Sequence, residues 1–509
     1  MSTRALATVV GVVVVVALTL GAGAFSLRRA RTPSEYYVAS RAISPATNAA
    51  AVSGEYLSAA SFLGIAGLVL SRGATSLWYP VGWTAGYLLL LLFVAAPLRR
   101  SRAYTLPDFA ELRLGTRAAR TAASTAVVVV AVLYLVPQFR EAGLTLRILT
   151  GAPTWVGAAI VAAVVLVNVT VGGMRSITLA QALQYWLKLV ALCLPLAFLL
   201  VRRSGGGQVV VERLRDPGWL EPVHGGQGLY VTYSLVVALF LGTMGLPHVA
   251  VRFYTNRDGR AARRTTVVVL ALLGVFYVLP PVYGALARAY LPETPTPGTG
   301  AADAAILTLP GHVVGGTLGD VLVAVLAAGA FAAFLSTSSG LVLSIAGVVG
   351  QDVIGRRLPP VPAFQVAGAA VAACALALTL LTSGLAVAQA VELAFVVAAS
   401  TLCPLLLLGI WWRGLTSPGA VAGMVVGGVL STAAVLTVTT GAVPGGGPGV
   451  MVAQPALVTV PAAFATMVVV SLLTRGARPP HVARIMVRLH TPEAVVLDRD
   501  GFRARGADD

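Results

Sequence analysis

Four consecutive hydroxyl side chains interrupt an apolar stretch of this 509-residue chain, which reads AAFLSTSSG over residues 332–340. They are Ser336, Thr337, Ser338 and Ser339. One or two such hydroxyls would bond to carbonyls of their own helix, but four in succession place at least two toward the protein interior. Hard cations prefer oxygen ligands. Together with the carbonyls that a broken helix frees, these hydroxyls predict a site for a small monovalent cation, sodium.

A second polar stretch, GEYLSAASFLGIAG over residues 54–67, lies inside another apolar run. Unpaired backbone groups are costly in lipid, so a broken helix survives only where it is buried in protein or lines a watery cavity. The glycines and serines alone could equally serve close packing between helices. The carboxylate of Glu55 favours a functional break, because an ionisable group inside a membrane marks a functional site by default.

A third stretch, FLGTMGLPHV, breaks a later run at Pro247. Two interrupted helices at corresponding positions are typical of secondary transporters with inverted repeats, which bind substrate where the breaks meet. A proline-kinked helix without any ligand remains an alternative. His248 follows the break directly, and a single histidine there is more often a hydrogen-bonding residue than a proton carrier.

Charged side chains occur inside two further runs. Lys188 is the only lysine, in the middle of QYWLKLVAL. It either pairs with Glu55 or attracts an anionic substrate, or it is a structural partner of a backbone carbonyl; the sequence leaves these open. Arg140 and Glu141 lie in VPQFREAGL. Arg140 could reach a substrate carboxylate, but we favour an Arg140–Glu141 pair with a structural role.

The composition identifies the elements that must position these residues. The chain is 57% hydrophobic and 11% charged, with a mean hydropathy of +0.86, which indicates a polytopic membrane protein. Because a bilayer core needs about 20 apolar residues per helix, we expect an all-α fold with about thirteen spans. They are predicted at 6–25, 46–70, 77–97, 121–142, 153–172, 178–201, 228–248, 265–288, 320–348, 362–382, 386–411, 418–440 and 454–474.

The arginines predict the orientation, because short cytoplasmic loops collect positive charge. One side of the predicted topology carries most of them, which places the N-terminus outside and the C-terminus inside. The segment from Arg202 to Gln227 is an exception, because it lies on the predicted outer side and carries four arginines. The arginines assigned to the inner side are Arg28, Arg29, Arg31, Arg41, Arg99, Arg100, Arg102, Arg113, Arg117, Arg120, Arg175, Arg252, Arg257, Arg260, Arg263, Arg264, Arg356, Arg357 and Arg413.

The same distribution excludes a nucleic-acid partner, although the net charge is +17, because the arginines are spread over helix ends. The first run is expected to be a retained helix, since it is longer than the apolar core of a signal peptide. Cys193, Cys374 and Cys403 fall inside spans without metal or disulfide spacing, so we expect them to be packing residues.

The chain resembles the sodium:solute symporter family, and most closely its acetate and short-chain monocarboxylate branch. The resemblance rests on four stretches in order: residues 34–67, YTLPDF (104–109), GTMGLPHVAVRFYT (242–255) and AAFLSTSSGLVLS (332–344). It implies a core of two inverted five-helix repeats, as in the bacterial leucine transporter. It also implies sodium ligands at Gly54, Leu57, Ala333, Ser336 and Thr337. Glu55 departs from the branch, which usually has aspartate there.

This resemblance divides the chain into a flanking helix and loop (1–45), a first repeat (46–201), an outer loop (202–227), a second repeat (228–411), two flanking helices (412–474) and a cytoplasmic tail (475–509). We expect a cell-membrane transporter that couples inward sodium movement to uptake of a small organic anion, by alternating access and without covalent chemistry. The candidate substrate and coupling residues are Glu55, Ser58, Lys188, Gly242, Thr243, Gly245, His248 and Arg140.

Two alternatives to this function remain open at the level of sequence. One is a proton-coupled carrier of another small solute, with Glu55 or Lys188 carrying the proton. The other is a non-transporting sensor on the same fold, although the tail is too short for a signalling domain. No cofactor is expected beyond sodium as the coupling ion. The expected partners are the lipid bilayer, sodium and the anion, and the sequence identifies no partner protein.

Overall fold

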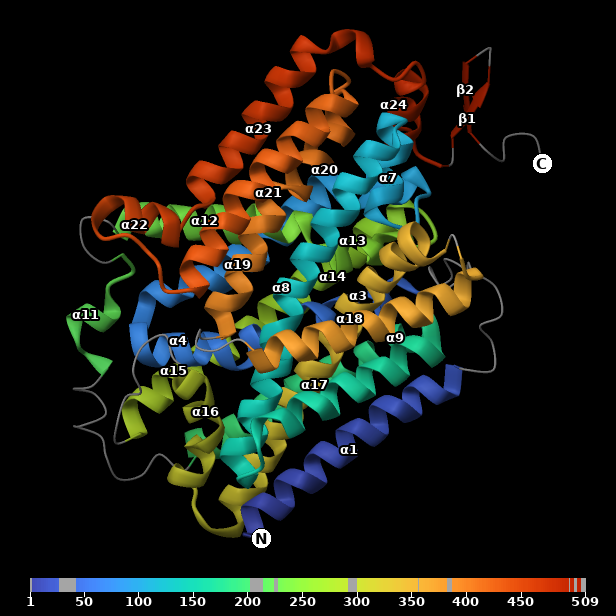
Figure 1. Ribbon diagram of the computed structural model, residues 1–509. Helices are drawn as coiled ribbons and strands as arrows, with labels where there is room; N and C mark the ends of the chain where they lie inside the picture. Colours follow the sequence, from blue (N-terminus) through green and yellow to red (C-terminus); the bar gives the residue numbers. More distant parts are fainter. Residues whose placement is uncertain are drawn as a thin grey trace.

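The computed structural model describes residues 2–26, 43–201, 214–223, 228–291, 300–355, 357–381, 387–493, 495–498 and 501–504. Within these ranges the fold is helical, apart from one short hairpin near the C-terminus (Figure 1). Within the described ranges, eleven helices are long and apolar enough to cross a membrane, and a shorter apolar helix spans Thr154–Thr170. The prediction of an all-α polytopic membrane protein is therefore confirmed.

The helices of the first half carry the first break and the only lysine. Their bounds are α1 (Thr3–Ser26), α3 (Pro45–Tyr56), the π-helical η2 (Ala60–Gly64), α4 (Ile65–Arg72), η3 (Gly73–Leu77), α5 (Trp78–Leu89), η4 (Leu90–Val94), α6 (Ala95–Ser101), α7 (Leu106–Leu114), α8 (Arg117–Thr150) and α9 (Thr154–Val201). The predicted spans 153–172 and 178–201 correspond to the two helical parts of α9, which a kink at Gly173 separates. α7 falls between two predicted spans.

The second half carries the other break and the hydroxyl cluster. Its elements are α11 (Pro217–Leu220), α12 (Gly228–Gly245), α13 (Pro247–Tyr254), α14 (Gly259–Tyr277), α15 (Leu279–Tyr290), α16 (Gly300–Val313), α17 (Gly316–Val349), η5 (Gly350–Ile354), α18 (Pro360–Leu381), α19 (Val387–Ser400), α20 (Leu402–Trp411), α21 (Ser417–Thr439), α22 (Gly446–Ala453), α23 (Ala456–Leu473), η6 (Arg475–Ala477), α24 (Val482–His490), β1 (Val495–Asp498) and β2 (Gly501–Ala504).

The first break follows from the way α3 begins and ends. Ser44 caps its N-terminus by accepting a hydrogen bond from the Thr47 amide, and Pro45 occupies the first helical position, where a missing N–H costs nothing. The helix stops at Leu57, whose ψ of 85° is not helical. Helical structure resumes at Ala59, and the predicted break in residues 54–67 is confirmed at Leu57 and Ser58.

The second break lies between α12 and α13. Leu246 has an extended ψ of 119°, and Pro247 begins α13. Proline disfavours the helical conformation of the residue before it, so the sequence itself sets the position of this break. α13 then continues to Tyr254, six residues beyond the predicted end of the span at residue 248.

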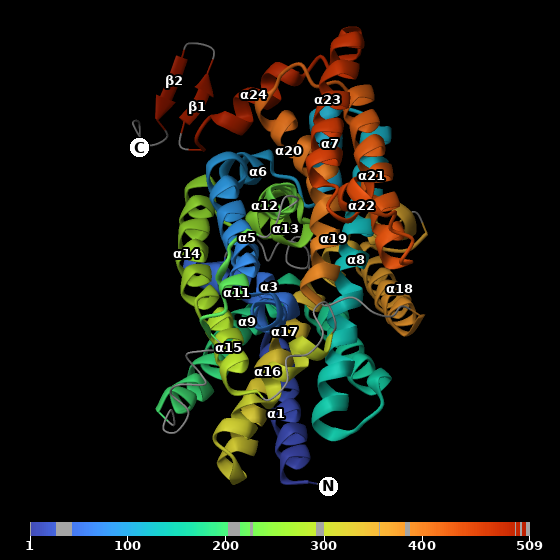
Figure 2. The ribbon, with the colours of Figure 1, turned by 90° about the vertical axis from the view of Figure 1, so that its left-hand side faces the viewer.

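The core of the molecule is α17, which packs against α9, α8, α1 and α3. Figure 2 shows α3, α12, α13 and α17 in the centre, with α14 to one side and α21 and α23 to the other. Close approach depends on small residues: a Cβ at Gly54 would collide with the backbone of Gln181 in α9. α1 begins at one end of the molecule and α24 lies at the opposite end in both views (Figures 1 and 2).

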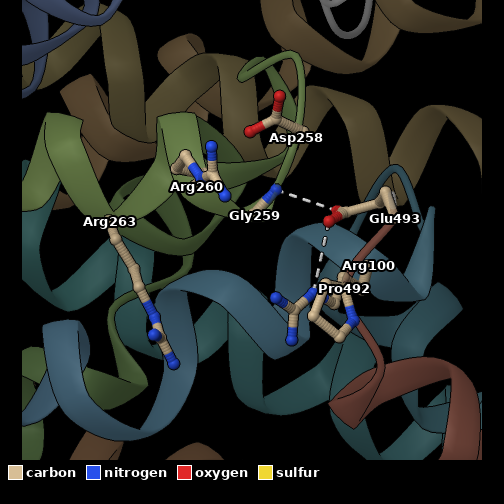
Figure 3. A pocket seen from close by; sticks show the side chains of 7 residues that line it. All are labelled: Arg100, Asp258, Gly259, Arg260, Arg263, Pro492 and Glu493. Carbon is tan, nitrogen blue, oxygen red and sulfur yellow. Dashed lines mark hydrogen bonds and ion pairs between the residues drawn. The ribbon is translucent and has the colours of Figure 1, made fainter. Parts of the chain in front are cut away.

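The C-terminal segment docks on the end of the helical core. α24 contacts α6, α7 and α20. Glu493 accepts a hydrogen bond from the Gly259 amide at 2.8 Å and pairs with Arg100 at 3.4 Å (Figure 3). Residues 482–490 of the tail therefore form a helix that packs against the helical core.

Candidate functional site

The first helix break meets the hydroxyl cluster of α17. The Thr337 hydroxyl donates to the carbonyl of Glu55 at 2.6 Å, and the Ser336 hydroxyl donates to the carbonyl of Ala333 at 3.0 Å. All four hydroxyl residues of the cluster are buried. The structure therefore brings the α17 hydroxyls to the carbonyls that the end of α3 leaves free.

The cation at this meeting point is the ammonium of Lys188, which projects from α9. It donates to the carbonyls of Gly54 and Leu57, the latter at 2.6 Å, and to the Ser336 hydroxyl at 2.7 Å. An ammonium has three donors, and these three acceptors satisfy them. The interpretation of Lys188 as a partner of backbone carbonyls is therefore the one that the structure favours, while its predicted pairing with Glu55 is replaced by these contacts.

The donor set fits a sodium ion in its chemistry. The five predicted ligands are neutral oxygens from Gly54, Leu57, Ala333, Ser336 and Thr337, the kind that suits a hard monovalent ion. Three of these oxygens bind the Lys188 ammonium instead. Sodium and the ammonium would use the same oxygens.

The carboxylate of Glu55 pairs with Arg252 of α13, with 2.5 Å between Oε2 and Nε. Both side chains are buried, at 2% and 0% exposure. Arg252 also donates to Thr178 at 2.7 Å and to the side-chain carbonyl of Gln181. This network joins the two broken helices through α9.

Placing Arg252 among the cytoplasmic loop arginines was wrong. It lies one turn past the second break, on a helix that continues inside the protein. Arg113 is likewise buried, on α7, where it donates to the carbonyls of Gly409 and Trp412. Burial lowers the pKa of Arg113 to about 10. A buried arginine and a loop arginine can both follow the end of an apolar run, so the sequence pattern does not distinguish them.

The candidates of the second break divide into two groups. Gly242 and Gly245 face α19, where an added Cβ would collide with the carbonyls of Phe395 and Ala398. Both glycines therefore permit close packing against α19, and their role toward a substrate stays a prediction. The hydroxyl of Thr243 lies 2.9 Å from the hydroxyl of Tyr56, and this hydrogen bond connects α12 to the end of α3.

His248 and three other polar side chains carry buried hydrogen-bonding groups with no partner in the described part of the chain. These groups are both ring nitrogens of His248, the indole N–H of Trp83, the hydroxyl of Tyr87 and the side-chain NH₂ of Gln138. The carbonyl oxygen of Gln138 accepts from the Ala59 amide at 3.0 Å, immediately after the first break. Buried polar groups are normally hydrogen-bonded, so this set indicates a place for a polar ligand.

Aromatic rings connect His248 with Trp83. Tyr134 contacts His248 and Phe395, with ring centroids 5.4 and 5.8 Å apart, and Phe395 contacts Trp83 at 5.9 Å. The Ser58 hydroxyl, at the first break, is also buried without a hydrogen-bond partner in the described residues. The sequence did not single out Trp83, Tyr87 or Gln138, because a lone polar or aromatic residue in an apolar span has no periodicity that marks it.

Arg140 belongs to a second charged cluster. It interacts electrostatically with Glu141 and with Asp303 of α16, and Asp303 accepts a hydrogen bond from the Val387 amide at 3.1 Å. Glu141 and Asp303 are both buried. This arrangement supports the structural interpretation of Arg140, with Asp303 as an additional partner that lies far away in the sequence.

Comparisons with known proteins agree with this geometry. The chain matches the model of the Sodium:solute symporter family over residues 36–427. It is 30% identical to an uncharacterised symporter, YwcA, of Bacillus subtilis (strain 168), over 88% of this chain and 91% of the relative. It is also 30% identical to a monocarboxylic acid transporter of Corynebacterium glutamicum, over 85% of each chain.

Two solved structures share the fold. A Na⁺-coupled sialic acid symporter, in a substrate-bound outward-open state, matches with a TM-score of 0.74 at 16% identity, over 91% of this chain and 98% of that one. Mhp1, a nucleobase-cation-symport-1 transporter, matches with a TM-score of 0.55 at 14% identity, over 90% and 99%. The predicted leucine-transporter-type fold is confirmed, and the family is one of transporters rather than enzymes. This chain belongs to the sodium:solute symporter family.

Proposed function

We propose that this protein takes up acetate or another short-chain monocarboxylate together with sodium, by alternating access. The main support is the site at the two helix breaks, where neutral oxygens suited to sodium adjoin buried donors without partners. The 30% identical relative that is named a monocarboxylic acid transporter supports the same substrate class.

Charge at the site favours an anion. Lys188 and Arg252 contribute two positive charges, and Glu55 contributes one negative charge; all three side chains are buried. A buried charge without a counter-ion is costly, and a sodium ion that replaces the ammonium on the shared oxygens would maintain the positive excess. A carboxylate substrate would offset this excess and accept hydrogen bonds from the indole of Trp83 and the amide of Gln138, which are the donor types that recognise carboxylates.

Coupling follows from different affinities in the two states. A ligand shifts a conformational equilibrium only if it binds one of the two states more tightly than the other. Sodium at the junction of α3 and α17 would stabilise the conformation in which the helix break is accessible to substrate. The start of α1 and the C-terminal helix α24 lie at opposite ends of the molecule (Figure 1), which fits the proposed topology, with the N-terminus outside and the C-terminus inside.

Uptake of labelled acetate into proteoliposomes tests this function. An inward sodium gradient is compared with an equal potassium gradient and with an imposed pH gradient. The proposal expects sodium-dependent uptake that unlabelled propionate or pyruvate inhibits. Uptake driven by the pH gradient alone would contradict sodium coupling, and no acetate uptake under any gradient would contradict the substrate.

A further inference from the structure

The Lys188 side chain fills the place at which the proposed function needs a sodium ion. Its ammonium binds the carbonyls of Gly54 and Leu57 and the hydroxyl of Ser336, and it is fully buried. Two cations cannot share three oxygens at bonding distance, because their charges repel strongly in a medium of low dielectric. We propose that Lys188 is a tethered competitor of sodium, whose ammonium occupies the ion site in the sodium-free carrier and leaves when sodium binds.

The hydrogen bonds of the Lys188 ammonium all end on neutral oxygens, while the Glu55 carboxylate attracts the ammonium electrostatically. The carboxylate of Glu55 makes its hydrogen-bonded ion pair with Arg252, not with Lys188. The ammonium is therefore attached through three neutral oxygens and a flexible four-carbon stem. A side chain held in this way can leave the site while its backbone stays in α9, so exchange with sodium needs no rearrangement of the helix.

The competitor has a role in the transport cycle. After sodium and substrate are released, the carrier must return empty, and carbonyls freed by the break would then be buried without hydrogen-bond partners, which is costly. The Lys188 ammonium satisfies two of those carbonyls and the Ser336 hydroxyl. It thereby stabilises the sodium-free carrier and weakens sodium binding by the same free energy.

This inference rests on the proposed sodium coupling, and its direct test is binding of radiolabelled sodium to the purified full-length protein at one fixed pH. Lys188→Met removes the ammonium and keeps the length of the side chain, and Lys188→Gln keeps a polar end. If the ammonium occupies the site in about nine of ten sodium-free molecules, its removal raises the apparent sodium affinity about tenfold. Gln184→Ala is the control, because Gln184 is buried on the same helix and bonds only to Thr19 in the described structure.

Size-exclusion profiles establish that each variant is folded. Stronger sodium binding by either Lys188 variant than by the wild type and by Gln184→Ala supports the competition. Equal or weaker binding by folded Lys188 variants would overturn it while leaving sodium coupling intact. If neither the wild type nor any Lys188 variant binds sodium, the sodium site itself is wrong and the proposed function fails with it.

A second measurement separates this role from a structural one. Exchange of labelled for unlabelled acetate in the presence of sodium on both sides needs no return of the empty carrier, whereas net uptake does. We expect Lys188→Met to retain exchange and to lose most of its net uptake. A parallel loss of exchange and net uptake would show that Lys188 supports the fold of the site and would contradict the proposed role.

Discussion

The side-chain nitrogen of Lys188 lies 2.6 Å from the backbone carbonyl oxygen of Leu57, at the residue where α3 ceases to be helical. The break frees that carbonyl, and a lysine from another helix binds it. A cation at this position is therefore part of the fold itself. Each of the following predictions tests one part of the surrounding arrangement.

Thr337→Ala should weaken sodium binding about tenfold or more, because it removes one oxygen ligand and leaves the carbonyl of Glu55 without its donor. Thr337→Ser keeps the oxygen and should restore binding. Ser338→Ala is the matched control, since the Ser338 hydroxyl is buried without a partner in the described structure. Sodium titrations of the purified proteins measure the effect, and an equal loss in Ser338→Ala would contradict a specific role for Thr337.

Breaking the Glu55–Arg252 pair should destabilise the protein strongly. Glu55→Gln and Arg252→Gln should each cost about 3–5 kcal/mol, because either change leaves a buried charge uncompensated. The double variant should lose less free energy of unfolding than the two single variants lose in sum. Unfolding followed by intrinsic fluorescence in detergent gives the four values of the cycle, and additive losses would show that the two side chains do not interact.

Gly340 sets the room available to the Glu55 carboxylate, since a Cβ at this position would collide with its Oε1 atom. Gly340→Ala should therefore destabilise the protein by about 1–3 kcal/mol, and the shorter Glu55→Asp should relieve part of the loss. Gly368→Ala serves as the control, because its added methyl would lie 3.6 Å from the Cβ of Ala346, an ordinary contact. Melting temperatures that fall equally in both alanine variants would refute the specific contact.

Trp83→Phe should raise the KM for acetate about tenfold, because it removes a buried N–H that we assign to the substrate carboxylate and keeps an aromatic ring in place. The corresponding control is Trp78→Phe. The indole N–H of Trp78 already donates to the carbonyl of Pro222 at 3.0 Å, so its loss should leave KM unchanged. An unchanged KM in Trp83→Phe would remove Trp83 from the proposed substrate site.

The sequence predicts the broken helices and the hydroxyl cluster well, because each rests on local chemistry. Pro247 forces an extended residue before it, and consecutive hydroxyls are conspicuous in an apolar run. The partners of Glu55 and Lys188 are set by long-range packing, which no local pattern contains. Arg252 looks like a loop arginine until α13 is seen to continue inside the protein, and Asp303 lies more than 160 residues from Glu141 in the sequence.

The short C-terminal helix was beyond the sequence, whereas the division of residues 153–201 into two parts was not. The runs 153–172 and 178–201 are predicted as separate spans, and α9 is interrupted between them by a kink at Gly173, where φ is 61°. α24 carries too few apolar residues to look like a span, yet it packs on α6 and α7 with Leu489 fully buried. Its position depends on a surface that only the folded core provides.

Sodium coupling can be measured as coupled flux. Proteoliposomes are prepared with equal sodium inside and outside, and an inward acetate gradient is imposed at zero membrane potential while radiolabelled sodium is followed. We expect acetate entry to drive net sodium entry, which is reduced in Thr337→Ala and absent from protein-free vesicles. Acetate entry without any accompanying sodium movement would contradict sodium coupling.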